Sequence, residues 1–79
     1  MSRARDVVEV VARTLADHPS DVKVTESEHR GQLLVELFMA PGDLGRVIGR
    51  QGRTAQAIRA LAGAAADLED RRVTVEFRD

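Results

Sequence analysis

The chain has 79 residues, a formal net charge of −1 and no cysteine. That length suits one small domain over residues 1–79, and without cysteine neither a disulfide nor a thiolate metal site can stabilise it. Hydrophobic residues make up 43% of the chain, with no apolar run near the ~18 residues of a membrane span, so we expect a folded cytoplasmic protein that does not enter a membrane.

A helix is predicted at the start of the chain, over residues 3–17. Val7, Val8, Val11 and Leu15 recur there at helical spacing. Valine is only a modest helix former, so a strand is the alternative. The length of the pattern favours the helix, and the His18-Pro19 pair would end it.

Two strands are predicted next, over 21–28 and 32–39, joined by a turn at 29–31. The first alternates, with Val22 and Val24 on its apolar face. The second has apolar residues on both faces, which is typical of a central strand. One face carries Leu33, Val35, Leu37 and Met39, and the other face carries Leu34 and Phe38.

Two helices and a last strand are predicted in the second half. A short helix opens at Pro41, a longer one covers 54–68, and an alternating strand covers 72–78. Both phenylalanines are expected in the core. The positions expected to face inward are Leu44, Val47 and Ile48 on the short helix, Ile58, Leu61, Ala62 and Ala65 on the long helix, and Val73, Val75 and Phe77 on the strand.

The two predicted helices are joined by Gly49-Arg50-Gln51-Gly52, directly after an aliphatic pair. Glycine accepts a positive φ and has no side chain to hold a ligand away. The long helix begins here, so its unpaired N–H groups and positive dipole end would face an anion in this loop. Taken alone, the two glycines could also form an ordinary helix-terminating turn.

The charge is unevenly distributed along the chain. Residues 44–66 hold four arginines and no acid, a local charge of +4, whereas the remaining eight basic and thirteen acidic residues give −5. Screening limits the reach of each charge to about 8–10 Å, so a basic patch on an acidic body can still bind phosphates. The arginines of this basic segment are Arg46, Arg50, Arg53 and Arg59.

Other functional classes lack their signatures. The glycine spacing matches neither a nucleotide-binding P-loop nor a dinucleotide fold. There is no Trp or Tyr to form the stacking platform of an RRM or an OB-fold. His18 and His29 lack a ligand cluster, and no nucleophile, base and orienting group come together. We therefore expect no enzyme, no metal and no cofactor.

The order of predicted elements, helix-strand-strand-helix-helix-strand, resembles that of the type II KH domain, and the 47–53 stretch resembles the KH signature of an aliphatic pair followed by Gly-x-x-Gly. Asp43, Gly45, Arg46 and the alanine-rich helix are similar, more narrowly, to small bacterial single-KH proteins of the KhpA type. This resemblance, which covers the whole chain, implies an α+β fold with three strands and the helices packed on one face of the sheet.

The resemblance also implies binding of single-stranded RNA, with the loop on the backbone and bases in an adjoining apolar groove. A post-transcriptional regulator or an RNA chaperone is the expected role. Many KH domains have a bulky aliphatic residue at the position of Ala55, so this chain departs from the family pattern there. Arg59 is expected to be simply solvated. Arg46 and Arg53 could likewise be ordinary solvated charges. The residues expected to contact RNA are Arg46, Ile48, Gly49, Arg50, Gln51, Gly52 and Arg53.

A protein-interaction module is the alternative function. Ala57, Ala60 and Ala64 form a second stripe on the long helix, where small side chains would let another helix approach. Alanine is also the best helix former, so the stripe has a plain structural explanation. The resemblance implies self-association, or pairing with a larger KH protein carrying Jag and R3H regions, as a homodimer or heterodimer.

Overall fold

The computed structural model describes all residues from 1 to 79, and its elements follow the predicted α-β-β-α-α-β order. Two short 3-10 turns, η1 and η2, interrupt that series. None of the helices is both long and apolar enough to cross a membrane. The elements are α1 (Arg3–Leu15), η1 (Pro19–Asp21), β1 (Lys23–His29), β2 (Gln32–Phe38), α2 (Pro41–Ile48), η2 (Arg50–Gly52), α3 (Arg53–Asp67) and β3 (Arg72–Arg78).

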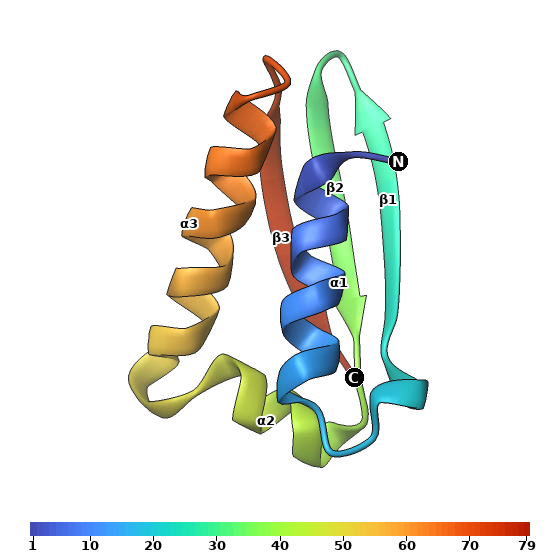
Figure 1. Cartoon of the computed structure of the whole chain (residues 1–79), viewed down its shortest axis with the longest axis vertical. Helices are drawn as coiled ribbons and strands as arrows, with labels where there is room; N and C mark the ends of the chain where they lie inside the picture. The colour runs from blue at the N-terminus through green and yellow to red at the C-terminus, as the bar shows by residue number, and fades with distance from the viewer.

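The three strands form one sheet in the order β1-β2-β3, so β2 is central, as predicted. β1 and β2 form an antiparallel hairpin, and β3 runs parallel to β2. A parallel neighbour cannot be reached by a tight turn, so α2, η2 and α3 form the crossover. α1 and α3 lie side by side over one face of the sheet, and the joint between α2 and α3 lies at the end opposite the β1–β2 turn (Figure 1).

The core lies between the sheet and these two helices. Alternate positions of β2 supply Leu33, Val35 and Leu37, all fully buried, because side chains of a strand alternate between its faces. Of the two apolar faces predicted for this strand, the helices cover the one with Leu33, Val35 and Leu37 (Figure 1). Phe38, on the face without helices, is half-buried, and Phe77 packs against the edge of the core.

The buried face of α1 differs from the predicted valine stripe. Ala4, Val8 and Ala12 are fully buried, whereas Val7 and Val11 only flank the core. Residues four apart lie on one face of a helix, so these three form the row that packs inward. Small alanines in that row let α1 approach its neighbours closely.

The prediction that Leu61 faces the sheet is wrong, because its side chain is 52% exposed. Ile58 and Ala62 are buried as predicted, and Ala66 completes the same row. At 3.6 residues per turn, Leu61 lies about 100° from Ala62, the centre of that row. α3 therefore presents a narrow inward face to the sheet.

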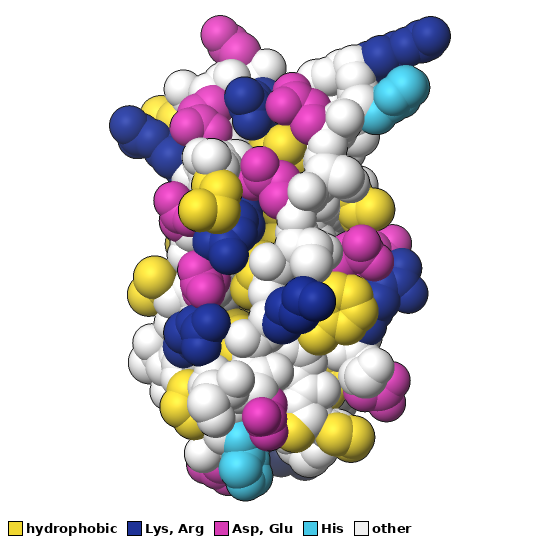
Figure 2. Space-filling view, turned by 90° about the vertical axis from the view of Figure 1, so that its right-hand side faces the viewer, with side chains coloured by type: hydrophobic (Ala, Val, Ile, Leu, Met, Phe, Trp, Pro, Cys, Tyr) yellow, Lys and Arg dark blue, Asp and Glu magenta, His cyan; other side chains and the backbone are white.

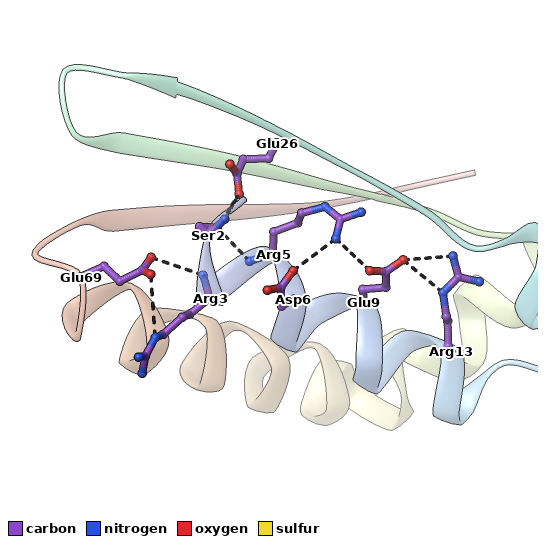
Figure 3. Close-up of polar contacts among 8 residues, drawn as sticks. All are labelled: Ser2, Arg3, Arg5, Asp6, Glu9, Arg13, Glu26 and Glu69. Atoms are coloured by element: carbon purple, nitrogen blue, oxygen red, sulfur yellow. Dashed lines mark hydrogen bonds and ion pairs between the residues drawn. The ribbon is translucent and has the colours of Figure 1, made fainter.

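Polar contacts anchor the start of α1 (Figure 3). The Ser2 hydroxyl caps the helix by accepting from the backbone N–H of Arg5 at 3.1 Å, and it donates to the Glu26 carboxylate on β1. The Ser2 backbone N–H donates to the same carboxylate at 2.9 Å. The Ser2 hydroxyl, helped by this N–H, outweighs burial and holds the pKa of Glu26 below its ordinary value. α1 is thereby tied to the sheet.

The connection from α1 to β1 is longer than predicted, because both flanking elements are shorter at this point. The helix ends at Leu15 and the strand begins at Lys23, because the intervening segment contains the 3-10 turn η1. The Arg13 guanidinium holds this turn, donating to the carbonyl of Pro19 at 2.6 Å and to that of Val22 at 3.2 Å.

Asp43 joins this connection to α2. Its side chain is only 4% exposed, and its carboxylate accepts from the backbone N–H groups of Asp17 at 3.2 Å and His18 at 2.9 Å. Burial alone would raise the pKa of Asp43, but the N–H groups of His18 and Asp17 outweigh burial and hold that pKa below its ordinary value. Asp43 thus fixes the helix that leads into the Gly-x-x-Gly loop.

These contacts predict an acid-sensitive contribution to stability. The pKa of Asp43 is lowered in the folded state, so its ionised form stabilises the fold above the unfolded pKa of about 3.9. This contribution is lost as pH falls through the lower folded pKa. We expect Asp43→Asn to lower the free energy of unfolding at pH 7 and to lose less stability than the wild type between pH 5 and pH 3, measured by urea denaturation.

Asp21→Asn is the matched control, because Asp21 is exposed and joins no ion pair. It should leave the pH dependence of unfolding unchanged. Parallel stability curves for Asp43→Asn and the wild type over this range would contradict the assignment.

Candidate nucleic-acid interface

The Gly-x-x-Gly loop is a sharp joint built on left-handed backbone. α2 ends at Ile48, and Gly49 follows with φ 78° and ψ 174°, a region that essentially only glycine adopts. Gln51 has φ 57° and Gly52 has φ 71°, both left-handed. Three of the four loop residues therefore turn the chain so that α3 can begin at once.

The two glycines have different roles. A Cβ on Gly49 would lie 2.4 Å from the Thr54 Oγ1 atom, so a bare α-carbon here is required by the first turn of α3. A Cβ on Gly52 would meet nothing within 4 Å. Gly49 therefore closes the joint, and Gly52 leaves backbone open to a ligand.

The side chains of the loop are free. Arg50, Gln51 and Arg53 are exposed, and none of the three forms an ion pair or a side-chain hydrogen bond. No side chain caps the start of α3, so its first N–H groups add a positive partial charge beside these cations. The loop is an open, electropositive surface.

Arg46, the other predicted cation, points elsewhere. Its guanidinium pairs with both carboxylate oxygens of Asp17, at 3.0 and 2.9 Å, just beyond the end of α1. Both side chains are more than half exposed, so this ion pair is weak. The structure does not bring Arg46 together with the loop cations, and its contact with RNA stays a prediction.

A shallow groove of about 350 Å³ adjoins the loop. Ile48 and Ala55 line it, and Ala55 is only 4% exposed. The small Ala55 side chain keeps this part of the groove open. The lining is completed by Gly52 from η2, Gln56 and Arg59 from the first half of α3, and Glu76 and Phe77 from β3.

Arg59 was expected to be simply solvated, and that prediction is wrong. Its Cζ atom lies 4.8 Å from the centroid of the Phe77 ring, and its Nε and Nη2 atoms donate to the Val75 carbonyl at 3.4 and 3.3 Å. The sequence did indicate that Arg59 lies near the groove, because Arg59 follows Ala55 by four residues and so shares its helix face. The ring beneath it comes from β3, which helical spacing could not reveal.

Charge is mixed on the side of the molecule that carries β1. Figure 2 shows basic and acidic side chains interspersed there, without a continuous basic area. In contrast, residues 44–66 carry no acid at all. The loop is therefore the best candidate for binding a polyanion.

This element order, with a Gly-x-x-Gly joint between the two crossover helices, defines a KH domain of the type II arrangement. The family model described as "KhpA/KhpB, KH domain" matches residues 5–77. The chain therefore belongs to the KhpA/KhpB family of KH domains.

Curated relatives match over nearly their whole length. RNA-binding protein KhpA of Halalkalibacterium halodurans is 45% identical over 75 residues, covering 95% of this chain and 99% of the relative. The protein of the same name from Leifsonia xyli is 51% identical, covering 87% and 88%. That of Aquifex aeolicus is 41% identical, covering 98% of each.

A solved structure shares the fold. Era, determined in complex with MgGDPNP and nucleotides 1506–1542 of 16S ribosomal RNA, aligns with a TM-score of 0.67 over 95% of this chain and 29% of the Era chain. The two sequences are 21% identical, so this similarity supports the fold alone.

The geometry of the loop predicts unequal effects of two alanine substitutions. Gly49→Ala would place a Cβ against Thr54 in a backbone region closed to alanine, and we expect a loss of about 3 kcal/mol in the free energy of unfolding. Gly52→Ala meets open space in a left-handed conformation, so a loss of about 1 kcal/mol is expected. Urea denaturation measures both, and equal losses would contradict these separate roles.

Proposed function

We propose that this chain is a non-enzymatic RNA-binding protein whose Gly-x-x-Gly loop holds the backbone of single-stranded RNA. The observation that carries the proposal is the open loop: Arg50, Gln51 and Arg53 are exposed and have no partners within the chain, and the α-carbon of Gly52 beside them faces open space. The names of the curated relatives, RNA-binding protein KhpA, support the same ligand.

Each loop residue has a distinct task in this proposal. Gly52 and the uncapped start of α3 admit a phosphate close to the backbone N–H groups. Arg50 and Arg53 contribute charge, and Gln51 donates a hydrogen bond. Arg46 joins them by releasing Asp17, an exposed pair whose loss costs at most about 1 kcal/mol.

The groove explains why single-stranded RNA would bind in preference to duplex RNA. Ile48 and Ala55 form an apolar surface next to the loop, which unpaired bases can cover. Bases in an RNA duplex are stacked and paired, and side chains cannot reach them in its deep major groove. Backbone held at the loop and bases in the groove suit a post-transcriptional regulator or an RNA chaperone acting in the cytoplasm.

The loop provides the first test. Arg50→Asp with Gln51→Asp keeps both glycines and changes the local charge by three units where the phosphates lie. We expect affinity for a single-stranded RNA, measured by fluorescence anisotropy, to fall at least tenfold, the equivalent of about 1.4 kcal/mol. The melting temperature should barely change, because both side chains are exposed.

A matched double substitution provides the control. His29→Asp with Arg30→Asp makes a similar charge change on exposed residues at the end of β1 and in the β1–β2 turn, at the opposite end of the molecule (Figure 1). It should weaken RNA binding far less. Equal losses in the two double variants would indicate a diffuse electrostatic field, and no loss in either would exclude the loop as the RNA site.

A second function, association with another protein chain, is favoured by the outer surface of the helices. Ala57, Ala60 and Ala64 are all exposed on α3. Leu61 is 52% exposed and Leu68 is 74% exposed. Each follows an alanine of the stripe by four residues and so lies on the same helix face. We propose that this alanine stripe supports a homodimer, or a heterodimer with a larger KH protein containing an R3H region.

Ala60→Glu tests the association. The longer, charged side chain would separate two helices that approach through alanines, so we expect a shift towards monomer in light scattering with an unchanged circular dichroism spectrum. Ser20→Glu, an exposed position in η1, is the control and should not alter the molar mass. An unaltered molar mass for Ala60→Glu would exclude the alanine stripe as an interface.

A further inference from the structure

Arg59 occupies a special position in the groove. Its guanidinium lies over the Phe77 ring at 4.8 Å, and two of its nitrogen atoms donate to the Val75 carbonyl. The ring and the carbonyl both belong to β3, so the cation is held at several points although its side chain is exposed. Its remaining surface borders the groove.

We propose that Arg59 is a base-stacking residue, on which an unpaired nucleobase lies with the guanidinium between it and Phe77. This inference rests on the proposed RNA binding and adds where a base is held. A guanidinium is planar and weakly hydrated, and it stacks on aromatic rings and on bases. The chain has no Trp or Tyr, so this arginine supplies a flat surface that its aromatic residues do not.

The position along α3 suits a nucleotide next to the held phosphate. Arg59 lies seven residues after Gly52, a rise of about 10 Å along the helix. Gly52, Ala55 and Arg59 line the same groove, and the small side chain of Ala55 leaves room between the loop and the guanidinium. A strand fixed at the loop can therefore extend along the groove to Arg59.

Two substitutions separate the planar shape of the Arg59 guanidinium from its charge. Arg59→Lys keeps the charge and loses the planar group. Arg59→Met keeps an apolar stem over Phe77 and loses both the charge and the planar group. The probes are a fluorescein-labelled octaadenylate RNA and the same oligomer with its four central bases removed. A third oligomer carries 2-aminopurine at one central position, because fluorescence quenching of this base reports stacking directly.

We expect the wild type to bind octaadenylate more tightly than the abasic oligomer. Arg59→Lys should bind octaadenylate about five- to tenfold more weakly than the wild type, within the range for one stacked base, with unchanged binding of the abasic oligomer. Arg59→Met should lose the same preference for bases. Quenching of 2-aminopurine should be seen with the wild type and lost in both variants, with melting temperatures confirming that both variants fold.

Other outcomes overturn the inference in distinguishable ways. If Arg59→Lys binds octaadenylate as tightly as the wild type, or weakens both oligomers equally, Arg59 does not stack on a base. If the wild type binds both oligomers equally and only the loop double variant weakens them, the backbone contact stands and base stacking is excluded. If the wild type binds neither oligomer, both the inference and the proposed function are wrong.

Discussion

The packing of Thr54 against the bare α-carbon of Gly49 is the constraint on which the site depends. This contact leaves no room for a Cβ, and the φ and ψ angles of Gly49 belong to glycine alone. It sets the direction in which α3 leaves α2, and so places α3 beside β3. The groove exists because these two elements meet, and the same turn leaves open space beside the α-carbon of Gly52.

The loop holds two cations that no carboxylate of the chain neutralises. Six arginines form ion pairs, whereas Arg50 and Arg53, like Arg30, Arg59 and Arg72, have no carboxylate partner. Because cations without partners need not break an existing contact, they can meet a phosphate at no cost to the fold. The engaged arginines are Arg3, Arg5, Arg13, Arg46, Arg71 and Arg78.

The sequence predicted those parts of the structure that depend on local periodicity. Alternation identified β2 and its two apolar faces, and the glycine spacing identified the loop between two helices. The predictions from sequence were wrong where the position of a side chain depends on neighbours distant in the chain. Leu61 is exposed because α3 offers the sheet only a narrow face, and Arg59 is held by a ring from β3. Neither fact can be read from helical spacing.

The parallel pairing of β3 with β2 has a consequence for folding. Phe77 lines the groove from β3, whereas the loop lies some 25 residues earlier in the chain, so the groove forms only when segments distant in sequence meet. Such contacts must overcome the entropy of closing the intervening chain. The loop joint can therefore form from local contacts, whereas the groove depends on the complete sheet.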